Sequence, residues 1–209
     1  MTYSAPLTQK PDVVMTVRLK GRATAASVSD AVGFDASAVL DELAQEGLVE
    51  PVTSFFKITP AGRDAATRTL DAVRAEIGQT ALSAVYEAFC TTNSDFKATV
   101  TDWQLRTVDG VQVLNDHSDH RYDRAVLARL AVIHDEVSAL LAGLPQSARR
   151  FGRYRDRLTF SLGKLTAGRR EFMASPAVDS YHSVWFEMHE ELIMLCGLTR
   201  ADEAESGRG

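Results

Sequence analysis

The stretch EGLVEPVTSFFKITPAGRDA, Glu46–Ala65, decides the fold of the first third of the chain. A helical pattern ends at its first glycine, and two β-prone pieces follow, LVEPV and SFFKI, joined by a Thr-Ser pair. Pro51 is compatible with a two-stranded hairpin because both strands of such a hairpin are edge strands. Thr59 can then cap a new helix that has Pro60 at its first position, where proline is favoured. The stretch therefore predicts a small hairpin between two helices.

Three short helices are predicted before this hairpin, since each has a helical apolar period and ends at a glycine. Thr24 and Asp35 are suitable N-caps for the second and third of them. The residues predicted to be buried on these helices are Val13, Val14, Val17, Val28, Val32, Val39, Leu40 and Leu43. The order helix-helix-helix-hairpin-helix predicts a winged helix-turn-helix domain over residues 12–69, in which the hairpin is the wing.

A resemblance to a known family is carried by the segments LDELAQEGLVE and FKITPAGRDA. In this order they resemble the part of MarR-type winged-helix proteins that runs from the third helix through the wing. The resemblance covers about residues 12–75. It implies a winged-helix fold and, by analogy, binding of an operator in double-stranded DNA by a transcriptional regulator.

In this fold the third helix normally enters the major groove and presents polar side chains to the bases. The candidate DNA-binding residues are Arg18, Lys20, Arg22, Ser37, Gln45 and Lys57. The outward face of the third helix, predicted over residues 36–46, has three acidic residues and no basic one. Residues 12–76 contain seven Lys and Arg residues against ten Asp and Glu residues, whereas a DNA-binding module usually has a basic surface.

An adaptor module that binds a protein partner in place of DNA is therefore a second hypothesis. The region from VRLKG to the wing, together with DSYHSVWFEMHEEL, resembles actinobacterial segments associated with pyruvate phosphate dikinase-like proteins. That resemblance implies a regulatory subunit of a phosphoenolpyruvate-utilising enzyme. The acidic third helix favours the adaptor, and the complete wing favours the regulator.

The rest of the chain is predicted to be helical. We expect a long linker helix over 70–92, bent at Gly78 or straight, an all-α helical domain over 93–200, and a disordered tail over 201–209. A linker helix with an apolar stripe can pair between subunits or pack on its own helical domain. Because helix-turn-helix proteins usually bind two half-sites, a homodimer is expected. The segment ARRFGRYRDR is predicted to present most of its arginines on a solvated helix face, with a surface for phosphate or an acidic ligand as the alternative.

The helical domain also contains the candidate effector residues. A small organic ligand would suit a pocket of aromatic and polar side chains, for which the candidates are Trp103, Gln104, Asn115, His117, Tyr181, His182, Trp185 and His189. No cofactor motif is present, and a divalent metal ion is the other effector considered. The histidines that could bind it are His117, His134, His182 and His189. The last two are about 10.5 Å apart along a helix, so a metal site would have to be built across helices. Core or capping roles for all these side chains remain a third interpretation.

Composition and motifs narrow the remaining classes. The chain has 209 residues, a net charge of −5 and no apolar run of membrane-spanning length, so no membrane partner is expected. Its first residues, MTYSAPLTQKPDVV, lack the pattern of a secretory signal, and its two cysteines have no metal-type spacing. These features favour a cytoplasmic protein. We find no motif of a nucleophile elbow, a P-loop or a dinucleotide fold, and we predict that the protein is not an enzyme.

Overall fold

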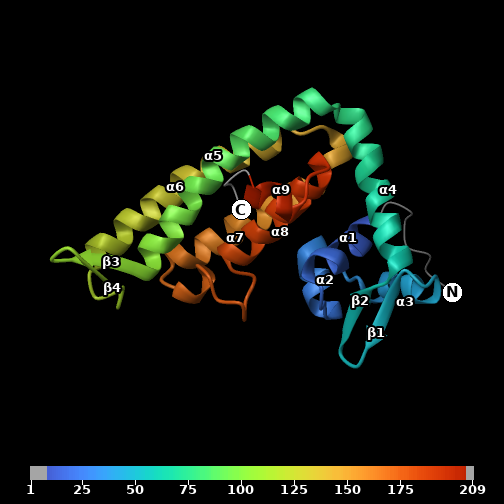
Figure 1. Cartoon of the computed structure of the whole chain (residues 1–209). Coiled ribbons are helices and arrows are strands. Elements are labelled where there is room, and N and C mark those ends of the chain that lie inside the picture. The colour runs from blue at the N-terminus through green and yellow to red at the C-terminus, as the bar shows by residue number, and fades with distance from the viewer. Residues whose placement is uncertain (1–8, 206–209) are drawn as a thin grey trace. The chain divides into compact units, whose positions relative to one another are not determined.

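The computed structural model describes residues 9–205, which are mainly helical (Figure 1). The chain divides into two compact units, Met1–Gln79 and Thr80–Gly209. Within residues 9–205, none of the helices combines the length and the apolarity that crossing a membrane requires. The first eight residues, which bear on the predicted lack of a secretory signal, lie outside the described residues, as do the last four of the predicted tail.

The first unit has the element order that the sequence predicts for it. A two-stranded antiparallel hairpin stands between its third and fourth helices (Figure 1). The elements are α1 (Lys10–Lys20), α2 (Ala25–Val32), α3 (Ser37–Gln45), β1 (Val49–Val52), β2 (Phe55–Ile58) and α4 (Pro60–Ile77).

The helix ends of this unit follow from local capping. The Thr24 hydroxyl oxygen accepts a hydrogen bond from the Ser27 backbone N–H at 3.1 Å, and α2 ends at Gly33, which has φ of 76°. The predicted caps and stops of α2 are therefore confirmed. Helix α3 begins one residue later than predicted. Ala36 is its N-cap and is fully buried, so it does not belong to the outward face as the sequence pattern indicated.

The hairpin pairs Val49 with Ile58 and Val52 with Phe55, and its turn is the predicted Thr-Ser pair. A third segment of chain joins its edge, because Ala23 exchanges two backbone hydrogen bonds with Phe56, at 3.2 and 2.7 Å. The residue just before α2 is thus tied to the second strand. This bridge holds the hairpin against the helices.

The turn into α4 is the tightest contact of the first unit. The Thr59 hydroxyl oxygen accepts from the Gly62 N–H at 3.0 Å and donates to the Gly47 carbonyl at 2.7 Å, which confirms the predicted cap. A Cβ atom on Gly62 would lie 2.0 Å from the Leu48 carbonyl oxygen and 2.6 Å from Cδ1 of Ile58. Only glycine fits here, because the helix backbone itself packs on the strand.

The prediction of one continuous helix through the linker is wrong. Gly78 has φ of 84° and ψ of 146°, a backbone conformation that no α-helix contains, so α4 stops at Ile77. A second helix, α5 (Gln79–Gln104), begins immediately after it.

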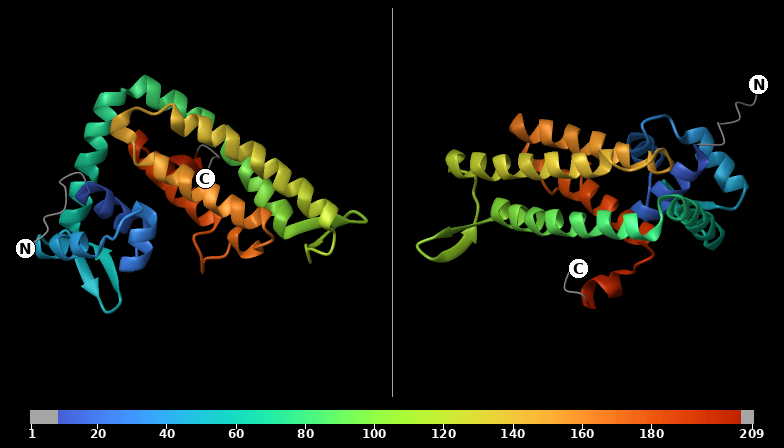
Figure 2. Two further views of the ribbon diagram at one scale, coloured as in Figure 1. Left: turned by 180° about the vertical axis from the view of Figure 1, so that it is seen from behind. Right: turned by 90° about the horizontal axis from the view of Figure 1, so that it is seen from above.

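The second unit is built from long helices with one more hairpin (Figure 2). Its elements after α5 are β3 (Leu105–Val108), β4 (Val111–Leu114), α6 (His120–Ala142), α7 (Phe151–Thr166), α8 (Tyr181–Cys196) and α9 (Arg200–Glu205). Helix α7 packs against both α6 and α8. Short 3₁₀ turns lie at Gln146–Ala148 and Arg170–Phe172.

The β3–β4 hairpin corrects the prediction of an all-α second domain. It projects from the ends of α5 and α6 (Figure 2), in a region for which the sequence predicts only helices. Its turn is Asp109-Gly110, and both residues have positive φ, 50° and 80°. Two such residues are what a tight type I′ hairpin turn requires, and Asp-Gly is a preferred pair for it.

Two arginines of the segment predicted to face solvent are instead turned inward. Arg150 donates from Nη2 to Oε2 of Glu191 at 2.9 Å, and the Tyr154 hydroxyl donates to the same oxygen at 2.6 Å. Glu191 has no exposed surface, so its carboxylate depends on these partners. Arg157 donates two hydrogen bonds to Asp179, at 2.6 and 2.7 Å. The interpretation as a solvated face is wrong for Arg150 and Arg157.

The segment predicted as a disordered tail contains a helix over its described residues. Helix α9 carries Glu203, whose side chain is fully buried in the second unit. It also carries Arg200, which binds the Glu190 carboxylate of α8. These two anchors hold α9 against the helical unit.

Replacing Gly62 with alanine is expected to destabilise the protein by about 3 kcal/mol or more, because the added Cβ would overlap a backbone oxygen. Urea unfolding followed by circular dichroism measures the change. Gly163→Ala in α7 is the control, since a Cβ there meets no atom within 4 Å. That variant should gain up to about 1 kcal/mol from helix propensity. Equal effects of the two substitutions would contradict the packing argument.

Candidate functional site

A cavity of about 370 Å³ lies in the second unit among α5, α8 and α9. This volume is within the range of small-molecule pockets, roughly 300–1,000 Å³. The residues that line it are Asn93, Phe96, Lys97, Val100, Thr101, His182, Trp185, Phe186, His189 and Arg200. The cavity therefore combines an aromatic surface with cationic and amide groups, and we take it as the candidate effector site.

Its aromatic wall is rigid. The rings of Phe96 and Trp185 are stacked, with centroids 4.3 Å apart and planes inclined by 22°. The indole N–H of Trp185 donates to the Asn93 side-chain oxygen at 2.9 Å. That hydrogen bond fixes the indole and leaves the Asn93 amide with its NH₂ group to offer a ligand. A flat apolar group can pack against this wall without displacing any protein hydrogen bond.

The polar edge of the cavity is cationic. Lys97 comes from α5 and Arg200 from α9. The Arg200 guanidinium lies 4.9 Å from the centroid of Phe186, and its Nε donates to the Glu190 carboxylate. Its Nη2 is buried and makes no hydrogen bond within residues 9–205. An unmet buried guanidinium N–H is costly, so this atom is the strongest single indication of a missing anionic partner.

His189 is the buried titratable group of the cavity. Its Nε2 lies 3.4 Å from the Tyr86 hydroxyl and 3.9 Å from Oε2 of Glu203. Burial, and after it the positive charges of Arg200 and Lys97, lower the pKa of His189 to about 4. His189 is therefore uncharged at neutral pH. Both cations that lower its pKa also line the cavity.

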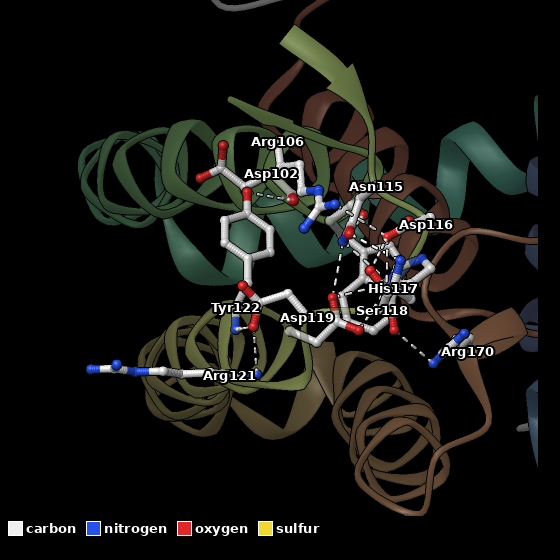
Figure 3. Close-up of polar contacts among 12 residues, drawn as sticks. Asp102, Arg106, Asn115, Asp116, His117, Ser118, Asp119, Arg121, Tyr122 and Arg170 are labelled. Atoms are coloured by element: carbon white, nitrogen blue, oxygen red, sulfur yellow. Dashed lines mark hydrogen bonds and ion pairs between the residues drawn. The ribbon is translucent and has the colours of Figure 1, made fainter. Parts of the chain in front are cut away.

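Another polar cluster closes on itself at the junction of β4 and α6 (Figure 3). The Asn115 amide donates to Oδ1 of Asp123 at 2.9 Å, and Nδ1 of His117 lies 3.1 Å from the same carboxylate. The His117 ring packs on Trp103 at 4.5 Å between centroids. Figure 3 shows Arg170 reaching the His117 carbonyl oxygen, at 3.2 Å. These contacts fix the connection into α6 and use the polar groups that a ligand would need.

The residues predicted to bind an organic ligand thus lie in different parts of the second unit. His182, Trp185 and His189 line the cavity. Three further members, Trp103, Asn115 and His117, belong to the closed cluster. Gln104 is exposed at the end of α5, and its carbonyl oxygen accepts from the Asn115 N–H. Tyr181 is fully buried and packs on Phe96 at 5.6 Å between centroids, behind the cavity wall.

Asn93, Lys97 and Arg200 line the cavity but are not among the residues predicted from the sequence. A signal was present for the first two, because residues 93, 96, 97, 100 and 101 recur at helical spacing on one face of α5. The cavity residues of α8 recur in the same way, at positions 182, 185, 186 and 189. Arg200 had no such signal, since it lies in the segment adjoining the predicted tail.

The four histidines predicted as metal ligands do not meet. His134 has Nδ1 at 3.3 Å from the Tyr181 hydroxyl and Nε2 at 3.2 Å from Oγ1 of Thr159, so both ring nitrogens have protein partners. Burial lowers the pKa of His134. Within the described part of the chain, no group of three or more His, Cys, Asp or Glu side chains is placed to hold a metal ion. The structure therefore provides no ligand set for the metal prediction.

The predicted DNA-binding residues fall into separate places within the first unit. Arg22 lies over the ring of Phe55 at 4.1 Å, and Nζ of Lys57 lies 5.7 Å from the same ring. We call these three residues the wing cluster. Arg18 is instead turned to α4, where its Nη1 donates to the Thr67 hydroxyl at 3.0 Å. Burial and the charge of Arg63 lower the Arg18 pKa.

Helix α3 presents Ser37, Asp41 and Gln45 as exposed residues. Its other acids are paired, because Nζ of Lys10 lies 2.8 Å from Glu42 and 2.6 Å from Glu46. The negative charge of this face is therefore smaller than the residue count indicates. Lys20, the remaining candidate, is half-buried at the end of α1.

Comparisons of this chain with protein-family models, with curated proteins and with solved structures give no match.

The low pKa of His189 predicts a specific loss of stability in acid. Below pH 6.5 the unfolded chain binds a proton that the folded chain accepts only near pH 4, so stability is complete above pH 6.5 and falls as the pH falls towards 4. Between pH 7 and 4.5 this contribution is about 2 to 3 kcal/mol. His189→Gln should lose less stability than the wild type over this interval by that amount. Urea unfolding at both pH values measures it.

His120→Gln is the matched control, because His120 is exposed at the start of α6. It should keep the pH dependence of the wild type. The same acid loss in the wild type and in His189→Gln would mean that other groups cause the loss.

Proposed function

We propose that this chain is a DNA-binding transcriptional regulator in which the first unit is a winged helix-turn-helix module of the MarR type and the second unit binds an effector. The observation that supports the first half is the element order α1–α2–α3–β1–β2–α4 with Ala23 bridged to Phe56. In such a module the third helix follows a tight turn after the second, and the hairpin stands beside it. The cavity of the second unit supports the second half.

The proposed DNA contacts separate into two kinds. The wing cluster would contact phosphates, because Arg22 and Lys57 are exposed cations that lie near the same aromatic ring. Stacking on Phe55 reduces the freedom that the Arg22 side chain would lose on binding. Ser37 and Gln45 of α3 would face base edges, with Gln45 able to form paired hydrogen bonds to adenine.

Charge sets the strength of this interaction. Lys10 pairs with Glu42 and Glu46 and offsets one of their two negative charges, but the first unit still offers few cations for phosphate contacts. A single unit should therefore bind non-specific DNA weakly. Two copies that read two half-sites would double the number of contacts, as is usual for helix-turn-helix regulators.

A non-DNA-binding adaptor is the second candidate. What favours it is Asp41, an exposed acid in the middle of α3, on a helix that has no Lys or Arg between Ser37 and Gln45. Such a face would suit a basic partner protein, with the weak pyruvate phosphate dikinase-like resemblance indicating the kind of enzyme. Binding of DNA decides between the two candidates.

We expect a homodimer in solution. Light scattering at micromolar concentration should give twice the chain mass of 22.9 kDa. A mass of 22.9 kDa across that range would contradict the proposal of paired half-sites.

Removal of either wing cation should weaken DNA binding through lost phosphate contacts. Arg22→Ala and Lys57→Ala should each lower affinity for a duplex that carries the upstream region of the chain's own gene, by roughly three- to tenfold at low salt. Each loss should also reduce the slope of log affinity against log salt by about 0.9 per phosphate contact. Fluorescence anisotropy at several salt concentrations measures both quantities.

Lys164→Ala is the control, because Lys164 lies over Phe160 at 4.9 Å in the second unit, a similar cation–aromatic pair. It should leave affinity and slope unchanged. Asp41→Lys should raise non-specific affinity. DNA binding by Asp41→Lys without any by the wild type would put the adaptor first.

A further inference from the structure

We propose that the cavity among α5, α8 and α9 binds a small organic carboxylate with a flat apolar body. The binding itself does not depend on DNA; only the role of this ligand as an effector rests on the proposed function. Three features of the cavity carry the inference: its cationic edge, the already bonded backbone N–H groups of its α5 and α8 residues, and its stacked aromatic wall.

The cationic edge selects an anion. Nη2 of Arg200 is a buried donor that has no hydrogen-bond partner within residues 9–205, and Lys97 adds a second positive charge from the opposite helix. The only acid bound to Arg200, Glu190, occupies its Nε. The outer edge of the guanidinium thus keeps a donor for an incoming carboxylate, and charge-assisted hydrogen bonds of this kind are strong and directional.

A neutral ligand would leave this edge unsatisfied. His189, which lines the same cavity, is uncharged at neutral pH and provides no counter-charge for the Arg200 guanidinium. The Asn93 amide can donate one more hydrogen bond, because its oxygen is already used by Trp185. The cavity therefore offers several donors at one end and no free carboxylate among its lining residues.

A carboxylate suits these donors better than a phosphate does. Phosphate sites usually draw on several backbone N–H groups at a helix N-terminus. Here the backbone N–H of His182 donates to the Met173 carbonyl oxygen at 2.9 Å, and the other α5 and α8 residues that line the cavity lie beyond the first turns of their helices, where backbone N–H groups are bonded internally. At the start of α9 the Asp202 carboxylate already accepts from the Thr199 N–H at 2.7 Å, and its charge would repel a dianion.

The aromatic wall selects the rest of the ligand. Phe96 and Trp185 stack on one another and both line the cavity, and Val100 adds to its apolar area. A planar apolar group stacked on this wall would point its carboxylate towards Lys97 and Arg200. The volume of about 370 Å³ accommodates one such small molecule.

Phenylacetate is a suitable probe, with 2-phenylacetamide and benzyl phosphate as its neutral and phosphate analogues. The chain has two tryptophans, so Trp103→Phe leaves Trp185 of the cavity wall as the only indole. We expect phenylacetate to change the Trp185 fluorescence saturably, with the two analogues binding at least tenfold more weakly. Equal or tighter binding of either analogue, or no saturable change with any probe up to 10 mM, would overturn the proposal.

Variants locate the binding. Arg200→Gln and Lys97→Gln in the same Trp103→Phe background should each weaken phenylacetate binding at least tenfold. Arg169→Gln should not, although Arg169 also binds a carboxylate, that of Glu171, and also lies over a phenylalanine ring, Phe172. Unchanged affinity in Arg200→Gln would exclude this cavity.

Thr101→Phe provides a test that spares the interior. Thr101 is exposed at the cavity edge, so a larger side chain there should block entry while the melting temperature stays the same. Full binding by this folded variant would count against the site. All of these titrations omit DNA, so a failure of ligand binding is distinguishable from a failure of operator binding in the anisotropy assay.

Discussion

The first unit depends on the contact between the first turn of α4 and the strand that leads into the hairpin. At Gly62 the helix backbone lies so close to the Leu48 carbonyl that no side chain fits between them. Thr59 closes the same joint, since its hydroxyl both caps α4 and bonds the end of the α3 turn at Gly47. The hairpin is therefore held at its base from both sides. Both cations of the wing cluster, Arg22 and Lys57, remain exposed.

The sequence predicts this unit well because its signals are local. A cap such as Thr24 or Thr59 acts on amides two or three residues away, and a glycine such as Gly33 ends a helix through its own φ angle. None of these requires knowledge of the tertiary structure. The Asp109-Gly110 turn is equally local, and its hairpin was predictable in principle. The polar residues that follow this turn are not typical of a strand, so the sequence did not lead us to predict the hairpin.

The candidate site was predictable only in part because it depends on contacts between distant segments. Arg200 and Lys97 are separated by about a hundred residues, and only the packing of α9 brings them to one cavity. Partners also decide what a charged residue does. The sequence pattern predicts that Arg150 lies at the surface, yet its guanidinium donates a hydrogen bond to the fully buried Glu191. A pattern of residue types identifies a face of a helix but does not identify what covers that face.

Internal pairing of charged groups also determines how the charge of each unit should be interpreted. On α3, Lys10 takes up two carboxylates, so the acid count overstates the repulsion that DNA would meet. In the cavity, Glu190 takes up only one edge of the Arg200 guanidinium, so the pair is neutral in count but still has an unmet donor. Recognition depends on the hydrogen-bonding capacity that remains after internal pairing. Judged by unmet hydrogen-bond donors, the second unit is better suited to bind an anion than the first unit is to bind DNA.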